Sequence, residues 1–317
     1  MSPKLSAVGC ELSVALGLSG ARDLLLPRRS AIVIKSMKRV TTLLSFLAAC
    51  SVPDPGRDAS VAERSLTIAK LTIARDGDQV SSAATAQFVR YRGLEPASVP
   101  SLLGVADVAG IELGTCRSFD GTAALDQALA QAAQSGAEIA LLDAGRLELA
   151  AGGNHAAMSQ HAYPDVMPFV AGMVYGLGPD MTPAPGQLFE LSGDGGEDIG
   201  PFSVSVLAPS EYPHLSAGSI VPGSDLELSW QPLDAASEPL LIELKWPGRK
   251  GTRTVRCQVF DEGKFRVPAP LLAGLSDATQ SSLTATRSAR SRLSAPGASS
   301  IGQFAVELRD TLQKRSP

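Results

Sequence analysis

The sequence predicts a mainly β protein, with two antiparallel β-sandwich-like modules in tandem after a leader and one short helix in the first module. Apolar and polar residues alternate over short runs, which is typical of strands with one buried and one solvated face. Turn residues recur between these runs, and the 30 glycines and 22 prolines form no collagen-like repeat. Hydrophobic residues make up 44% of the 317, which is enough to build packed cores.

Residues 1–49 are expected to be a leader that ends in a signal peptide. A basic segment precedes the uncharged run 40–49, and this order of charge and hydrophobicity is typical of secretory signals. The basic residues are Lys35, Lys38 and Arg39. Met37 opens a compact version of this signal, so it is the expected start, in which case Cys10 is not translated.

The end of this segment, Leu47-Ala48-Ala49-Cys50, resembles the lipobox of bacterial lipoproteins. The resemblance implies that the Cys50 thiol receives a diacylglycerol, that the signal is cut before it, and that the new amine is acylated. Cys50 would then hold the protein on membrane lipid, and two or three acyl chains anchor firmly. Ser51 is similar to the residue at this position in lipoproteins of the outer membrane, facing the periplasm or the cell surface. The alternative is a buried cysteine in an ordinary hydrophobic segment.

The rest of the chain is expected to have four parts. Residues 50–63 form a flexible tether, and residues 64–207 form the first β-rich module. Residues 208–223 contain three prolines and form the linker, and residues 224–317 form an immunoglobulin-like β-sandwich.

In the first module, seven segments are expected to be strands, and an Ala-rich segment is expected to be a helix. The helix covers 122–135, and Gly136 stands where a C-terminal cap would be. The strands are 65–74, 80–92, 111–119, 138–150, 166–175, 187–192 and 201–207.

In the second module, alternation with period two is clearest around the two tryptophans. Leu228 and Trp230 alternate with polar residues, as do Leu244 and Trp246, so both indoles are expected to face inward. The expected strands are 225–230, 242–246, 252–260, 264–267, 281–287 and 304–309.

The runs PGQLFELSGDGGEDIGPFSVSVLAP (185–209) and VRCQVFDEGKFRVPAPLLAGL (255–275) resemble tandem β-modules of uncharacterised secreted or lipid-anchored envelope proteins of bacteria. The resemblance covers most of residues 140–310. It implies the fold and the location, and no activity.

Without Cys10 and Cys50, two of the four cysteines remain, Cys116 and Cys257. They fall in separate expected modules, so a disulfide would have to join the two. Cys257 alternates with apolar residues and is expected to face inward. A buried free thiol is the favoured interpretation, since free cysteine is among the most buried residue types, and a disulfide is the alternative.

The motifs of common enzymes are absent from the sequence, including G-x-S-x-G, H-E-x-x-H, C-x-x-C and G-x-x-x-x-G-K. His155, His161 and Asp165 are close in sequence and could be imagined as metal ligands, but their spacing fits no known site, and an exposed loop is favoured. No catalytic residue, metal site or cofactor is predicted.

Two charged segments of the sequence each allow a binding interpretation and a structural one. The acids of the glycine-rich segment 194–198 could bind calcium, but the EF-hand pattern is absent, and a solvated turn is the favoured interpretation. Arg287, Arg290 and Arg292 could meet a phosphate or an acidic partner, although an outward strand face is commoner. Aromatic residues are only 5%, which argues against a carbohydrate-stacking surface unless it uses Tyr163, Tyr175 or Tyr212.

Charge excludes one class of partner. Residues 1–49 are basic, but the remainder carries more acids than bases, so nucleic-acid binding is not expected. The expected function is a structural or binding role in the cell envelope, without enzymatic activity and with an unidentified envelope protein as a possible partner. The alternatives are a hydrolase that uses loop carboxylates and an assembly or chaperone subunit that uses an exposed strand edge.

Overall fold

The computed structural model describes residues 63–315 apart from 97, 104–109, 121–122, 164–168, 179–180, 182, 234–237, 249–250, 277 and 298–301. The expected leader, Cys50 and the expected tether up to residue 62 lie outside the described residues. The described chain is mainly β, which confirms the expected fold class. None of its helices has the length and apolar character needed to cross a membrane.

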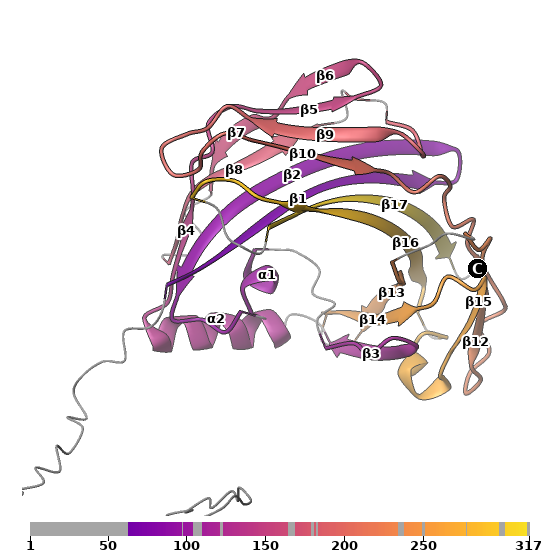
Figure 1. The fold of residues 1–317 in the computed structure, drawn as a ribbon. Helices are drawn as coiled ribbons and strands as arrows, with labels where there is room; N and C mark the ends of the chain where they lie inside the picture. Colours follow the sequence, from indigo (N-terminus) through magenta and orange to yellow (C-terminus); the bar gives the residue numbers. More distant parts are fainter. Residues whose placement is uncertain are drawn as a thin grey trace, which may run out of the picture. The chain divides into compact units, whose positions relative to one another are not determined.

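One nine-stranded sheet runs through most of the fold (Figure 1). Most neighbouring strands are antiparallel, but β1 pairs in parallel with β17, and β4 pairs in parallel with β8. In spatial order the strands are β14 (Gly251–Val259), β13 (Leu240–Gly248), β16 (Gln280–Leu293), β17 (Gly302–Arg315), β1 (Arg64–Asp76), β2 (Gln79–Arg92), β4 (Glu138–Leu141), β8 (Val170–Leu177) and β7 (Ser159–Ala162).

Two smaller sheets complete the β structure. A four-stranded sheet contains β10 (Phe202–Leu207), β9 (Leu188–Gly193), β5 (Leu147–Ala151) and β6 (Asn154–Ala157). A three-stranded sheet contains β11 (Ser216–Ala217), β12 (Leu226–Ser229) and β15 (Lys264–Val267). The long strands β1, β2, β16 and β17 curve, with β9 and β10 on their convex side and α1 (Ser98–Leu102) on their concave side (Figure 1).

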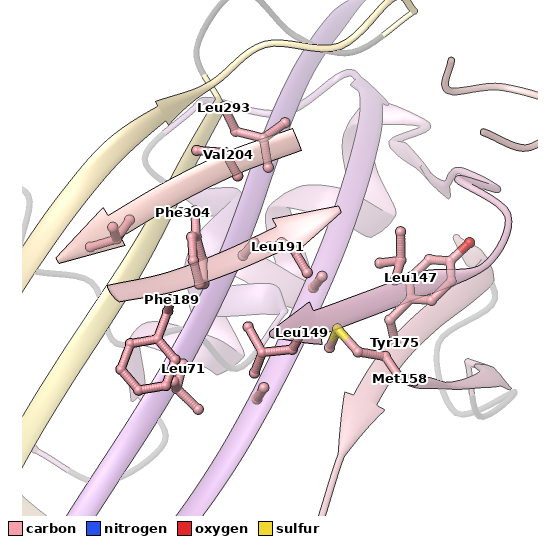
Figure 2. Close-up of a cluster of buried hydrophobic side chains, with 14 of the residues drawn as sticks. Leu71, Leu147, Leu149, Met158, Tyr175, Phe189, Leu191, Val204, Leu293 and Phe304 are labelled. Atoms are coloured by element: carbon pink, nitrogen blue, oxygen red, sulfur yellow. The ribbon is translucent and has the colours of Figure 1, made fainter. Parts of the chain in front are cut away.

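The convex face of the nine-stranded sheet is buried because every second residue of its strands is apolar. Leu71, Phe304 and Val306 pack with side chains of the four-stranded sheet, including Phe189 and Leu191, to form the first core (Figure 2). Further along the same face, the tryptophans and Cys257 pack with the three-stranded sheet in a second core. Trp230 and Trp246 are both buried, as their alternation predicted.

The concave face is covered by helices at one end. Helix α2 (Ala123–Ser135) and α1 pack there over Val89, Tyr91 and Ile139. The helix predicted at 122–135 is therefore present, and Gly136 follows it with a φ of 61°, a left-handed conformation that glycine adopts without strain.

All six strands expected in the second module are present, and the range 138–150 holds two strands, β4 and β5. Within the stretch 152–165, interpreted from the sequence as an exposed loop, residues 154–157 and 159–162 form β6 and β7 instead. Its strands are short and exposed, so they carry no apolar alternation that a sequence pattern could reveal. The two hydrophobic cores fall largely on either side of the expected linker 208–223, while one sheet connects them.

The favoured interpretation of the cysteines was wrong. Cys116 and Cys257 form a disulfide, with their Cα atoms 4.0 Å apart across 141 residues of sequence. The reason is that β3 (Thr115–Asp120) lies beside β14, and Leu113 makes a parallel β-bridge to Gln258. Cys257 has no exposed surface, so the expected inward position is confirmed.

Candidate functional site

The concave face of the nine-stranded sheet is charged where the helices leave it uncovered. Period-two alternation places Lys70 of β1, Arg290 of β16 and both Glu307 and Arg309 of β17 on this face, opposite the buried residues of the same strands. Strand pairing then sets Ala305 of β17 directly between Lys70 and Arg290. A small side chain therefore separates two long cationic side chains on adjacent strands.

These residues line a pocket of about 510 Å³, a size typical of small-molecule sites. Its polar lining comes from strands of both expected modules, and Pro100 of α1 and Ile111 supply apolar walls. Further apolar lining comes from Leu66, Ile68, Pro239 and Leu241. The pocket therefore combines an apolar surface with basic side chains. Among the described residues, Glu307 is the lining carboxylate beside Lys70 and Arg309, and Arg290 pairs with Glu238, which does not line the pocket.

Glu307 connects the charged groups. Its Oε2 atom lies 2.8 Å from Arg309 Nη2, accepts a hydrogen bond of 3.4 Å from Thr72 Oγ1, and lies 3.9 Å from Lys70 Nζ. The distance of 3.9 Å from Lys70 Nζ to Glu307 is too long for a hydrogen bond. Among the described residues, Lys70 therefore has a negative charge nearby but no close hydrogen-bond acceptor. Burial lowers the pKa of Lys70, and the negative charge of Glu307 opposes this shift only in part.

Arg309 also has unused donor capacity. Its Nε atom is buried and has no hydrogen-bond partner among the described residues. An arginine has five N–H donors, and burying a donor without an acceptor is unfavourable. Arg309 therefore has one N–H donor whose hydrogen-bonding capacity is unused among the described residues.

A second charged group lies on the same face, outside the pocket. Glu243 of β13 accepts a hydrogen bond of 2.7 Å from Arg256 Nε and lies 2.5 Å from Lys245 Nζ. Burial alone would raise the pKa of Glu243, but hydrogen bonds and positive charge from Lys245 and Arg256 outweigh it and hold this pKa below its ordinary value. This group is self-compensated, in contrast to the lining of the pocket.

The arginine cluster predicted from the sequence is divided between the two faces. Arg290 and Arg292 fall on the concave face, and Arg290 lies 3.2 Å from Glu238. Arg287 falls on the convex face, where it is 4% exposed and pairs with Asp261 at 2.7 Å. Arg287 also donates to the carbonyls of residues 211, 212 and 231, so it fixes the expected linker to the sheet.

The histidines do not form a metal site in the described part of the chain, where no group of three or more His, Cys, Asp or Glu side chains is placed to hold an ion. His155 lies 2.6 Å from Glu148 across the β5–β6 hairpin, and His161 is exposed on β7. Asp165, the third suggested ligand, lies outside the described residues.

The acidic segment 194–198 packs against the start of another loop. Asp198 Oδ2 accepts a hydrogen bond of 3.0 Å from the backbone N–H of Asp143, whose own carbonyl accepts from residues 198 and 199. Gly145 has a φ of 70° and lies against the backbone of Gly195, so any side chain there would collide with it. The glycines of this segment thus permit close backbone packing, which explains them without calcium.

Tyr175 and Asp143 form a further polar network at the edge of the first core. The Tyr175 hydroxyl donates to Asp143 Oδ1 at 3.0 Å and accepts from the backbone N–H of Ala144 at 2.8 Å. Burial raises the pKa of Tyr175 to about 12, while N–H and O–H donors led by Gly145 and Tyr175 lower the pKa of Asp143. Tyr175 is buried, and Tyr212 lies beneath the Arg75 guanidinium, so neither offers an open face for a sugar.

Neither alternative function receives the observation it needs from the described residues. A hydrolase would need a carboxyl group with a raised pKa beside an ionised one, but Asp143 and Glu243 both shift downward. A strand-edge chaperone would need a flat apolar edge strand. In the nine-stranded sheet, β7 has the sequence Ser-Gln-His-Ala, and residues 113–114 bond to Gln258 at the β14 edge. In the four-stranded sheet, the edge strand β10 alternates buried Phe202, Val204 and Val206 with exposed residues.

The pocket residues Lys70, Glu307 and Arg309 were not predicted as a site. In the sequence these charged residues alternate with apolar residues, and this alternation places each of them on one face of its strand. The parallel pairing of β1 with β17, the first and last strands of the described residues, brings these three side chains together.

Comparison with known proteins gives no family for this chain. No protein-family model matches it, and no curated protein does. Among solved structures, a yeast delta-COP-I mu-homology domain aligns with 78% of this chain and 95% of that chain, at 10% identity and a TM-score of 0.20. A score this low does not establish a shared fold, so the function has to be argued from the residues of the site.

Proposed function

We propose that this chain is a lipid-anchored envelope protein whose folded part binds a ligand in the concave pocket. The pocket carries the binding proposal, because it joins apolar walls and under-compensated cations in a volume suited to a small molecule. It has no arrangement of groups typical of an enzyme among the described residues, so binding without chemistry is the simplest role.

The anchoring rests on the sequence Leu47-Ala48-Ala49-Cys50 at the end of a basic and then apolar segment. The disulfide between Cys116 and Cys257 supports an envelope location, since disulfides persist in oxidising compartments such as the bacterial periplasm. The acylated Cys50 would hold the folded part on the outer membrane.

Anchoring is tested by the intact mass of the protein purified from bacterial membranes. We expect a chain that begins at Cys50 and carries acyl mass, and we expect Cys50→Ala to release the protein from the membrane fraction. Cys10→Ala is the matched cysteine control and should leave the fractionation unchanged. An unmodified Cys50 thiol, or unchanged fractionation of Cys50→Ala, would overturn the anchoring.

Binding is tested by native mass spectrometry of the same membrane-purified chain. We expect a non-covalent adduct of defined mass that disappears in Ala305→Phe, because the larger side chain fills the pocket between Lys70 and Arg290. An adduct retained in Ala305→Phe would place the ligand elsewhere and overturn this pocket as the binding site.

A further inference from the structure

Three cationic side chains line the concave pocket, and two of them flank one small residue. Lys70 and Arg290 flank Ala305 on adjacent strands, and Arg309 lies four residues further along β17 on the same face. Strands are about 4.8 Å apart, so the two flanking Cα atoms are separated by roughly 10 Å. A carboxylate or phosphate group above Ala305 would lie within reach of both side chains.

Lys70 is the least compensated of these cations among the described residues. Arg290 lies 3.2 Å from Glu238. Glu307 contacts Arg309 at 2.8 Å, but it remains 3.9 Å from Lys70, whose side chain is only 21% exposed. In the described part of the chain, the buried Nε atom of Arg309 also has no acceptor. A mostly buried cation without a close acceptor is unfavourable, and an anion that supplies one removes this penalty.

The rest of the lining has an apolar part beside the polar side chains of Gln258, Ser288 and Gln303. Leu66 and Ile68 continue along β1 from Lys70, and Pro100, Ile111 and Pro239 approach from other segments. A fully polar ligand such as an inorganic ion would leave these groups in contact with water. The lining is therefore complementary to a molecule with a charged end and an apolar end.

We propose that the pocket binds a small organic anion with one carboxylate or phosphate group and an aliphatic part, its charged end held by Lys70, Arg290 and Arg309. The proposal rests on the proposed function and names the chemical class of its ligand. The arginines favour bidentate contact with either anionic group, and Lys70 adds a point charge.

The test is calorimetric binding of four probes of equal chain length, decanoate, decyl phosphate, decanol and decylamine, below their micellar concentrations. The protein is the full chain carrying Cys50→Ala, so that no detergent is needed. We expect decanoate or decyl phosphate, or both, to bind at least about tenfold more tightly than decanol and decylamine, and the ratio between the two anions identifies the preferred group.

Variants separate pocket binding from non-specific uptake. Lys70→Met and Arg309→Met should each weaken anion binding about tenfold or more, because they remove charge and keep side-chain length. Ala305→Phe should abolish binding without changing charge. Lys245→Met, on the same face but outside the pocket lining, is the matched control and should have no effect.

Equal binding of the four probes, no binding of either anion, or anion binding that survives Lys70→Met and Arg309→Met would each overturn the anionic class. If decanol binds instead and Ala305→Phe blocks it, the pocket remains the binding site while its proposed selectivity fails. The anchoring is judged separately, from the mass and fractionation of the membrane-purified chain.

Discussion

Charged side chains have different surroundings on the two faces of the nine-stranded sheet. On the convex face, Arg287 is 4% exposed and meets Asp261, three backbone carbonyls and no open space. Three residues along the same strand, Arg290 projects from the concave face into a pocket of about 510 Å³. Arg287 is enclosed by acceptors, which indicates a structural role, whereas Arg290 pairs with Glu238 at 3.2 Å and still borders the pocket, which indicates a site. Both arginines belong to one short basic run.

The largest expected difference comes from removing these two arginines in turn. Arg287→Met removes the cation paired with the buried Asp261, which still accepts a hydrogen bond from Trp230 Nε1, and leaves the carbonyls of residues 211, 212 and 231 without this donor. The free energy of unfolding should therefore fall by about 3–5 kcal/mol. Arg290→Met, the matched variant on the other face, should change it by about 0.5 kcal/mol or less. Urea denaturation of both variants measures the contrast, and an equal loss in the two would remove the structural distinction between the faces.

The convex face also holds the disulfide. Replacing Cys116 and Cys257 together by alanine should lower the free energy of unfolding by about 2–5 kcal/mol, since the link closes a loop of 141 residues in the unfolded chain. The measurement is denaturation with and without reductant, and only the wild type should respond to reductant. Cys50→Ala serves as the control and should unfold as the wild type does. A wild type insensitive to reductant, with two titratable thiols besides Cys50, would contradict the disulfide.

The difference between the faces also explains how far the sequence could predict the structure. Period-two alternation is local, so it placed the strands of the second module, both buried tryptophans and the inward Cys257. In the expected strand 304–309, the same alternation separates Glu307 and Arg309 from the apolar residues, and Phe304, Val306 and Leu308 are buried on the opposite face.

Pairing between distant strands was not accessible from the sequence. Nothing near Lys70 indicates that β1 lies parallel to β17, and nothing near Cys116 indicates that β3 lies beside β14. The pocket and the disulfide both depend on such long-range neighbours. Strands β6 and β7 were missed for a different reason, because exposed strands have no apolar face to reveal them.

A smaller effect is expected at the edge of the first core. Tyr175→Phe removes the hydroxyl that donates to Asp143 and accepts from the buried N–H of Ala144, so stability should fall by about 1–3 kcal/mol. Tyr163→Phe, outside this network, is the matched control. Thermal unfolding of both variants is the measurement, and an unchanged midpoint for Tyr175→Phe would show that water replaces the hydroxyl without loss.

The smallest effect is expected on the concave face, from the self-compensated group at Glu243. Its folded-state pKa lies below the ordinary value because Lys245 and Arg256 outweigh the effect of burial. Its stabilising contribution is therefore fully present above the unfolded-state pKa, about 4.3, and is lost as the pH falls through the lower folded-state pKa.

Because the pair is partly exposed, Glu243→Gln should reduce the free energy of unfolding by about 1 kcal/mol or less at pH 7. The variant should lose less stability than the wild type between pH 5 and pH 3, when urea denaturation is repeated across that range. Glu227→Gln, which removes a pair whose carboxylate side chain is 71% exposed, should match the wild type at every pH. If Glu243→Gln and the wild type lost stability in parallel, the concave face would be held together by its apolar contacts alone, and its ion pairs would be available for ligands rather than for folding.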